Sequence, residues 1–360
     1  MPDLSMPHSS KLFSPLTIRD VTLRNRLIVS PMCQYSAVDG VPGAWHMTHY
    51  GSRAVGGAGM VIVEATAVTP EGRISPFDTG LWNARQSESF KPIVAFMAEH
   101  GAVPGIQLAH AGRKASTAAP WHGGAPLASS QGGWQTLAPS ALAFGDYPSP
   151  KAMSLDDLAS TRDAFVSSAR LALDAGFQVI EIHMAHGYLL HEFLSPLSNQ
   201  RRDQFGGAFE NRIRFPLEVA QAVREAWPSS KPLFVRVSAS DWMPGGWNIE
   251  ETIKFSAKLR DIGIDLIDTS SGGLVPDAKI PAAPLFQVPF ARRIRNEANI
   301  MSGAVGLITT ANEAETVLAD GDADVVLMAR QFLRDPYFAL HAAKELGAEI
   351  KWPRQMERGR

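Results

Sequence analysis

Short apolar runs rich in valine and isoleucine recur along the whole chain, and most are separated by segments with helical periodicity. Runs that are apolar on both faces are typical of buried parallel strands. The runs lie at residues 26–30, 60–64, 103–108, 178–182, 233–237, 266–268, 300–302 and 324–328. Strand–helix units that repeat without a break in composition predict an α/β fold, a single (β/α)8 TIM barrel, with residues 1–360 forming one domain.

The segments between these runs begin and end with helix signals. Ser154 and Asp157 form a capping-box-like start to a helix that continues to Ala175 and stops at Gly176. Asn248 begins another such helix, which leads to a glycine at position 263. These signals support the alternation of strands and helices that a barrel requires.

An open, doubly wound sheet is the alternative fold for this pattern. It would normally carry a glycine-rich dinucleotide fingerprint after its first strand, and none follows the run at 26–30. The glycines at 56–59 precede a strand, so they indicate a tight turn between a helix and a strand. One long non-periodic stretch, at 115–151, is rich in Pro, Gly, Ala and Ser. A domain linker would divide the units into two sets, so we favour an insertion after strand three, which leaves one barrel.

Charge and cysteine content exclude several classes of protein. The chain has 34 Lys and Arg against 36 Asp and Glu and no basic cluster interleaved with aromatic residues, so we expect no nucleic-acid partner. Cys33 is the only cysteine, which excludes an intrachain disulfide and cysteine-ligated zinc or iron–sulfur sites. The N-terminus lacks the apolar core of a secretory signal, and no stretch approaches the ~20 apolar residues of a membrane helix. We therefore expect a cytoplasmic protein without a membrane partner.

Polar side chains and glycines gather where the predicted strands end, on the face of a barrel that carries catalytic groups. Such residues occupy positions 30–35, 64–66, 107–110, 183–188, 236–238, 270–273, 303–306 and 329–330. A non-catalytic barrel used as a binding module would keep the core and lose this rim. The distribution therefore favours an enzyme over a structural or adaptor protein.

The end of strand four carries the sequence His183-Met-Ala-His186-Gly-Tyr188. His-x-x-His is half of a metal site, but zinc takes three or four ligands, and neither an H-E-x-x-H pattern nor a cysteine partner is visible, so we expect no metal. Two adjacent imidazoles can donate to one carbonyl or nitro oxygen and stabilise the negative charge that appears there when hydride reaches the β-carbon. Tyr188 is a candidate acid for the α-carbon. Ordinary rim histidines and a boundary tyrosine are an equally good interpretation of these residues alone.

The last two strands end in residues suited to phosphate, because barrels bind phosphate through backbone amides at this place. The residues there are Gly303, Gly306, Ala329 and Arg330. Arg236, at the end of strand five, adds a second cation, and its alternative role is a salt bridge with Asp268 or Glu181. Both arginines and both glycines at the phosphate end favour a phosphorylated cofactor.

Several long motifs occur together and in order. They include Ser30-Pro-Met-Cys-Gln-Tyr35, Gly105-Ile-Gln-Leu-Ala-His-Ala-Gly-Arg-Lys114 and Glu181-Ile-His-Met-Ala-His-Gly-Tyr188. With these motifs the chain resembles the old yellow enzyme family of FMN-dependent ene-reductases, and within it the thermophilic-like subclass. The chain departs from the family in Phe205, where a tyrosine is common, and in Ala329, where a glycine is common. Residues 118–135 are an insertion relative to the shortest relatives and lie where they could cover or narrow the site.

The resemblance implies which residues hold FMN. The isoalloxazine would contact Ser30, Pro31, Met32, Cys33, Ala65 and Gln107, with Gln107 at the pyrimidine edge. Arg236 would lie near flavin N1, and Ala329 and Arg330 would hold the phosphate. Cys33 beside the flavin marks the subclass, although a free cysteine is more often a small buried core residue.

The resemblance also implies the reaction. NADPH or NADH would deliver hydride to FMN, and the hydride would pass to the β-carbon of activated alkenes such as enones, enals, maleimides and nitroalkenes. His183 and His186 would bind the activating oxygen, Tyr188 would protonate the α-carbon, and Tyr35 would line the pocket.

The C-terminal tail at 351–360 resembles the segment by which subclass members complete a neighbour's active site. We therefore expect a homodimer or homotetramer in which Arg358 is shared between subunits, and a frayed, solvated end is the alternative. Two related enzyme types fit less well. A dienoyl-CoA reductase type adds an iron–sulfur cluster, which one cysteine excludes, and a dihydroorotate-type dehydrogenase lacks the His-x-x-His-x-Tyr run.

Overall fold

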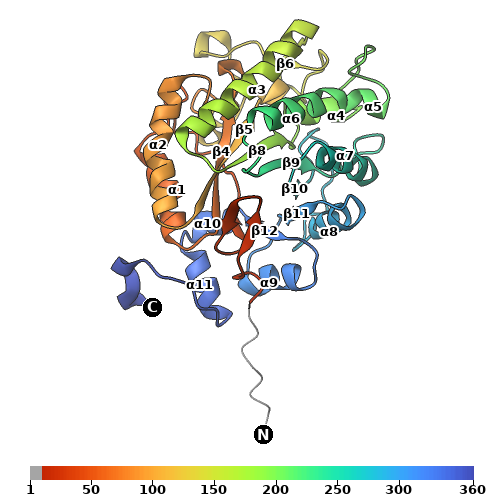
Figure 1. The fold of residues 1–360 in the computed structure, drawn as a ribbon. Coiled ribbons are helices and arrows are strands. Elements are labelled where there is room, and N and C mark those ends of the chain that lie inside the picture. The colour runs from red at the N-terminus through yellow and green to blue at the C-terminus, as the bar shows by residue number, and fades with distance from the viewer. Residues whose placement is uncertain (1–9) are drawn as a thin grey trace.

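Parallel strands follow one another around a closed barrel in the computed structural model, which describes residues 10–360 (Figure 1). Each predicted run overlaps one barrel strand. Closure comes from β12, which pairs in parallel with β3 through Val326 and Leu27. The TIM barrel is therefore confirmed, and the open sheet is excluded. The barrel strands are β3 (Leu27–Val29), β4 (Met60–Ala67), β5 (Val103–Ala109), β8 (Val179–Met184), β9 (Leu233–Ser238), β10 (Leu266–Ser270), β11 (Met301–Ala304) and β12 (Val325–Met328).

Helices cover the outside of the barrel (Figure 1). The predicted signals set the ends of α3: the Ser154 hydroxyl accepts a hydrogen bond from the Asp157 amide at 3.1 Å, and Gly176 follows the helix with a φ of 94°. Asn248 caps α7 in a similar way, as predicted. The helices are α1 (Ala44–Val55), α2 (Ala84–Glu99), α3 (Leu155–Ala175), α4 (Leu189–Leu194), α5 (Phe209–Arg212), α6 (Arg214–Ala226), α7 (Ile249–Asp261), α8 (Val288–Glu297), α9 (Ala311–Ala319), α10 (Arg330–Arg334) and α11 (Phe338–Glu345).

An antiparallel hairpin packs against the end of the barrel where the strands begin. Its strands, β1 (Leu16–Ile18) and β2 (Val21–Leu23), are too short to show a readable period, so the sequence pattern does not predict them. Side chains of the hairpin form one apolar cluster with side chains of the barrel strands. These include Ile28, Ile62, Phe234, Leu266 and Leu327. This apolar floor fills the lower interior, which leaves the opposite end of the barrel for a site.

The barrel interior becomes polar toward the carboxyl ends of the strands. Side chains alternate in and out along a strand, so in β8 Glu181 lies one row above the floor and His183 two rows above it. Strand register places Gln107 of β5 beside Glu181, and Arg236 of β9 beside Asp268 of β10. These polar residues therefore face the interior directly beneath the rim.

A β-bulge in β4 changes which of its residues face the barrel. The pairing with β5 shifts between Val63 and Ala65, so Glu64 is the extra residue. Ala65 consequently pairs with Gln107, while the buried Glu64 carboxylate accepts a hydrogen bond from the Tyr50 hydroxyl of α1 at 2.7 Å. The bulge thus puts a small side chain beside Gln107 and turns a carboxylate toward the helical layer.

The non-periodic stretch lies between β5 and α3, at the place where the sequence predicts an insertion. It contains two short 3-10 turns, η3 (Pro120–His122) and η4 (Ser129–Gln131). It also contains a short parallel pair, β6 (Leu137–Ala138) and β7 (Lys151–Ala152). Together with the 3-10 turn η2 (Gly112–Lys114), this segment connects the third barrel strand to its helix.

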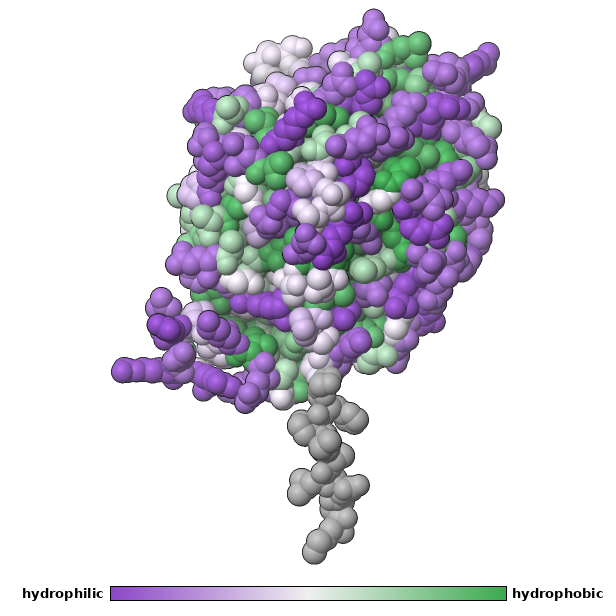
Figure 2. Space-filling model, in the orientation of Figure 1, coloured by the Kyte–Doolittle hydropathy of each residue, from purple (hydrophilic) through white to green (hydrophobic). Residues whose placement is uncertain are grey.

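Hydrophilic and hydrophobic residues are interspersed over the molecular face shown in Figure 2. Within residues 10–360, no helix combines the length and the apolar character that crossing a membrane requires. The chain ends after α11 in a short turn, η5 (Arg354–Gly359), which lies beside α11 (Figure 1).

Candidate active site

The turn after β8 gathers the three residues that the sequence singles out for catalysis. His186 and Gly187 both have left-handed backbone conformations, with φ of 61° and 73°. This turn brings the rings of His186 and Tyr188 to His183, at centroid separations of 5.3 and 5.1 Å, and both contacts are edge-to-face. His183, His186 and Tyr188 therefore form one cluster, which we call the histidine cluster, at the carboxyl end of the barrel.

Hydrogen bonds occupy one nitrogen of each imidazole. The Ala185 backbone N–H donates to His183 Nδ1 at 3.3 Å, so the neutral ring carries its proton on Nε2. His186 Nε2 lies 2.7 Å from Ser270 Oγ. The remaining nitrogens, His183 Nε2 and His186 Nδ1, can each form a hydrogen bond with a bound molecule.

Burial keeps these three groups uncharged. Burial, followed by the charge of Arg236, lowers the pKa of both His183 and His186 well below 6.5. Burial also raises the pKa of Tyr188 well above 10.0. At neutral pH the cluster therefore presents two neutral imidazoles and a phenol that keeps its proton, and each can donate a hydrogen bond.

Lys114 holds this turn in place, and the sequence patterns assign it no role. Its Nζ donates to the backbone carbonyls of His186 at 2.8 Å and Gly273 at 3.0 Å, and it lies 5.1 Å from the centre of the Tyr188 ring. Ser238 Oγ accepts from the His186 N–H at 2.9 Å. In the sequence, Lys114 ends the motif at 105–114 and Ser238 lies at the end of a predicted strand. Their contacts with His186 become visible only in the folded structure.

The loop after β3 carries Cys33 and Tyr35. Glu64 Oε2 accepts a hydrogen bond from the Gln34 N–H at 2.8 Å, which fixes the loop on the bulged strand. Burial and nearby carboxylates raise the pKa of Cys33 well above 9.0, so this residue is a neutral thiol. Tyr35 meets Trp121 of η3 edge-to-face at 5.8 Å. The segment between β5 and α3 therefore reaches a residue that the sequence places in the substrate pocket.

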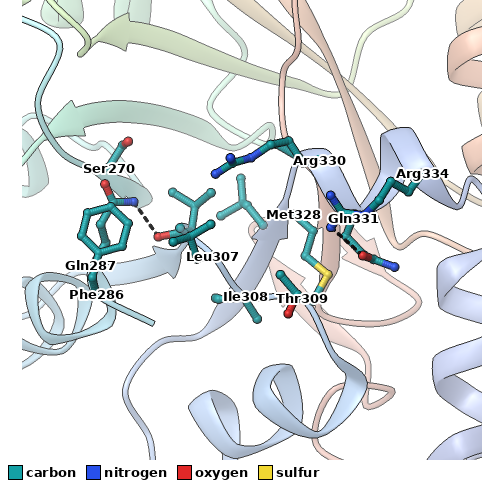
Figure 3. A pocket seen from close by; sticks show the side chains of 14 residues that line it. Ser270, Phe286, Gln287, Leu307, Ile308, Thr309, Met328, Arg330, Gln331 and Arg334 are labelled. Atoms are coloured by element: carbon teal, nitrogen blue, oxygen red, sulfur yellow. Dashed lines mark hydrogen bonds between the residues drawn. The ribbon is translucent and has the colours of Figure 1, made fainter. Parts of the chain in front are cut away.

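A cavity of about 310 Å³ opens at the carboxyl ends of β10, β11 and β12. Ser270 and Gln287 lie on one side of it, and Arg330 and Arg334 of α10 lie on the other (Figure 3). Gly306 also lines the cavity, with a φ of 117°, and an added Cβ would lie 2.4 Å from Gln287 Nε2. Glycine is therefore required at this position, and backbone forms that part of the wall.

Arg236 forms the salt bridge with Asp268 that the sequence offers as its alternative role, and it also contacts Ser30. Its Nη1 donates to Ser30 Oγ at 3.2 Å, which ties the ends of two distant strands. Its Nε lies 3.1 Å from Asp268 Oδ2, so it also forms a buried salt bridge. Ala329 and Arg330 line the cavity, as the sequence leads one to expect of phosphate-binding residues.

Two of the predicted site residues lie elsewhere. Gly303 lies in β11, where an added Cβ would come within 2.5 Å of Leu327, so this glycine permits close packing and does not line the cavity. Arg358 lines a separate cleft of about 360 Å³ with Tyr337 and Trp352, between α11 and the tail. Within one chain, Arg358 does not join the histidine cluster.

The fold and this site define a barrel of the enzyme type, whose arginine-lined cavity adjoins the histidine cluster through Ser270. Residues 11–349 match the NADH:flavin oxidoreductase / NADH oxidase family. An NADPH dehydrogenase of Geobacillus thermodenitrificans is 49% identical over 351 residues, which are 97% of this chain and 98% of that protein. The chain belongs to the NADH:flavin oxidoreductase / NADH oxidase family.

Solved structures add the old yellow enzyme type. Morphinone reductase matches with a TM-score of 0.79 at 27% identity, over 97% of this chain and 93% of its own. The old yellow enzyme homologue from Zymomonas mobilis matches with a TM-score of 0.78 at 28% identity, over 95% of this chain and 94% of its own. The resemblance to old yellow enzymes is confirmed. The protein is an NAD(P)H:flavin oxidoreductase with FMN as cofactor and a nicotinamide as reductant.

The residues at the carboxyl end fit FMN. Arg330 and Arg334 suit a phosphate, and the wall at Gly306 leaves room for one. Gln107 and Arg236 are buried side chains that face the interior and suit the hydrogen-bonding edge of a flavin. In the described part of the chain, no group of three or more His, Cys, Asp or Glu side chains could hold a metal ion.

Both histidines should stay neutral at about pH 6, where a free imidazole with a pKa of about 6.5 is mostly protonated. Histidine-selective NMR should then show His183 with its proton on Nε2. Because unfolding exposes rings that bind protons, the free energy of unfolding should fall as the pH drops below ~6.5. Ser270→Ala should change the ring signals of His186 and leave those of His183. Imidazolium signals from either ring at about pH 6 would contradict this assignment.

Proposed function

We propose that this enzyme reduces the activated C=C bonds of enones, enals, maleimides and nitroalkenes, with NADPH or NADH as reductant. The histidine cluster is the single observation that carries the proposal, because it sets two neutral imidazoles and a protonated phenol side by side. One carbonyl or nitro oxygen can accept hydrogen bonds from both rings. The name of the Geobacillus relative supports NADPH, and the name of morphinone reductase supports a reductase.

Bound FMN would accept hydride from the nicotinamide and deliver it to the alkene, and we propose residues for its site. The phosphate would lie in the cavity beside Gly306, Ala329 and Arg330, with Gly303 supporting this end through packing. Arg236 would lie beside the pyrimidine edge. The ring system would rest on residues that follow β3 or lie near the carboxyl ends of β4 and β5: Ser30, Pro31, Met32, Cys33, Ala65 and Gln107.

Gly306→Ala should weaken FMN binding at least about tenfold, which corresponds to 1.4 kcal/mol. The added methyl group would displace the side chain of Gln287, which also lines the cavity, and the φ of 117° is unfavourable for alanine. Gly321→Ala is a matched control, because Gly321 also has a positive φ, 73°, but nothing lies within 4 Å of an added Cβ. The control should lose some stability and keep FMN, as measured by the fluorescence of released flavin. Equal FMN affinity in both variants would argue against a phosphate site here.

The histidine cluster would act on the substrate in two ways. His183 Nε2 and His186 Nδ1 would hold the oxygen of the activating group, and their hydrogen bonds strengthen as negative charge moves onto that oxygen. Tyr188 would then give its phenolic proton to the α-carbon. Lys114, at 5.1 Å from the Tyr188 ring, would stabilise the phenolate that remains. Tyr35 would line the pocket from the loop after β3.

Tyr188→Phe should separate the two half-reactions. Reduction of the enzyme by NADPH needs no proton on the alkene, so its rate in stopped-flow bleaching should be retained. Oxidation by an enone should slow by about 10²–10⁴-fold, the range typical of general acid catalysis. His183→Ala should instead weaken enone binding and turnover together, by about 3 kcal/mol in the transition state. Equal losses in both half-reactions of Tyr188→Phe would assign Tyr188 a structural role.

We further propose that residues 1–360 act as one domain in a cytoplasmic homodimer or homotetramer, and that Arg358 completes the active site of a neighbouring subunit. Arg358 is exposed and lies apart from the histidine cluster of its own chain. Trp352 is partly buried in the cleft against α11, which gives the tail an anchor. A guanidinium is a planar donor suited to a carbonyl or carboxylate.

Arg358→Ala should raise the enone KM and leave FMN bound, whereas Arg354→Ala, an exposed arginine in the same tail, should change neither. Subunits carrying Arg358→Ala, mixed with subunits carrying Tyr188→Phe, should recover activity, because some composite sites would contain both intact groups. A monomer by sedimentation, with unchanged kinetics in Arg358→Ala, would refute the shared site.

A further inference from the structure

Four polar side chains form a layer inside the barrel, between the apolar floor and the histidine cluster. They are Gln107, Glu181, Arg236 and Asp268, each at most 6% exposed, and they come from the neighbouring strands β5, β8, β9 and β10. Gln107 Nε2 donates to Glu181 Oε1 at 2.8 Å, and Arg236 Nε lies 3.1 Å from Asp268 Oδ2. Two carboxyl groups therefore share one buried layer with one cation.

The hydrogen bonds of this layer do not satisfy both carboxyl groups as anions. Glu181 Oε2 and both Asp268 oxygens are buried and receive no hydrogen bond from the part of the chain that the structure describes. A buried charge that lacks partners is strongly unfavourable. One proton on Glu181 removes the conflict, because a protonated carboxyl donates to Asp268 while Asp268 stays ionised beside Arg236.

The surroundings of Glu181 favour this protonated form. Burial and then the neighbouring Asp268 raise the pKa of Glu181 well above 4.5. Arg236 and Gln107, which also face Glu181, act in the opposite direction and do not cancel the shift. Burial raises the pKa of Asp268 as well, but Arg236, 3.1 Å away, stabilises the charge of Asp268, so we assign the proton to the glutamate.

We propose that Glu181 is a neutral acid that shares its proton with Asp268, and that this pair is a positioning group for the pyrimidine edge of FMN. It acts through Gln107, whose NH2 group is held by Glu181, so that the amide oxygen is left to accept from a ring N–H. It acts also through Arg236, which keeps one anionic partner instead of two. The inference rests on the proposed placement of FMN at these two residues.

The net charge of this layer affects the midpoint potential of a flavin bound above it. With Glu181 protonated, the charges of Arg236 and Asp268 balance. Ionisation of Glu181 would add a negative charge beneath the flavin and oppose its reduction. Because burial raises the pKa of Glu181, this ionisation takes place above the usual pH range of a glutamate, and the midpoint potential should fall there more steeply than the flavin alone requires.

Two substitutions of Glu181 distinguish its positioning role from a role in packing the barrel core. Glu181→Gln keeps the shape and a donor toward Asp268, whereas Glu181→Ala removes the contact with Gln107. Glu192→Gln is the matched control. Glu192 is also completely buried, and burial raises its pKa to about 8, but it accepts a hydrogen bond from the Arg113 N–H at 2.9 Å, outside this layer.

Infrared spectra of the holoenzymes at neutral pH, with glutamate labelled in its carboxyl carbon, should show separate protonated-carboxyl bands, of which Glu181→Gln removes one and Glu192→Gln removes another. Midpoint potentials of the wild type and Glu181→Gln should coincide near neutral pH and diverge at alkaline pH, where the wild type falls further. Glu181→Ala should weaken FMN binding by about tenfold, as expected for the loss of one buried hydrogen bond.

If Glu181→Gln removes no protonated-carboxyl band from the wild-type spectrum, the neutral acid is overturned. A band that behaves as expected, together with unchanged potentials and FMN affinities in all variants, would overturn the positioning role. Neither measurement involves an alkene. Failure of the proposed function would show separately, as an enzyme that NADPH reduces and enones do not reoxidise.

Discussion

Pairing between β12 and β3 is the interaction on which the rest of the structure depends. These strands lie near opposite ends of the chain, and pairs from Val326 with Leu27 to Met328 with Val29 join them. Closure turns separate strand ends into one ring and leaves no open edge in the barrel. Ser30 can therefore accept a hydrogen bond from Arg236, which lies 206 residues later in the chain. In an open sheet the same residues would lie along a line, with no common cavity between them.

Burial is the physical effect that sets the protonation states of the side chains at the carboxyl end of the barrel. It disfavours the charged form of any group, so it lowers the pKa of His183 and His186 and raises that of Tyr188 and Cys33. One effect thus sets both imidazoles and the phenol in the neutral state, in which each carries a proton to donate. The apolar floor beneath them is part of this arrangement, because it keeps polar groups out of the lower barrel.

Local signals suffice to predict the barrel and to single out His183, His186 and Tyr188 as candidate site residues. Apolar runs, the Ser154 cap and the His-x-x-His-x-Tyr sequence each depend on a few adjacent residues. The bulge at Glu64 and the hairpin under the barrel depend instead on strands far away in the chain, so no local pattern predicts them. The same holds for Lys114 and Ser270, whose contacts exist because His186 adopts a left-handed conformation that is uncommon outside glycine.

The segment between β5 and α3 indicates how substrate range can change separately from the chemistry. Trp121 contacts Tyr35 at the mouth, yet it is 62% exposed and belongs to a surface segment. The histidine cluster, in contrast, is built on β8 and held by backbone contacts from Lys114 and Ser238. Loops tolerate sequence change better than strands, because fewer packing contacts constrain them. Changes within 118–135 would therefore reshape the surroundings of Tyr35 while His183, His186 and Tyr188 keep their positions.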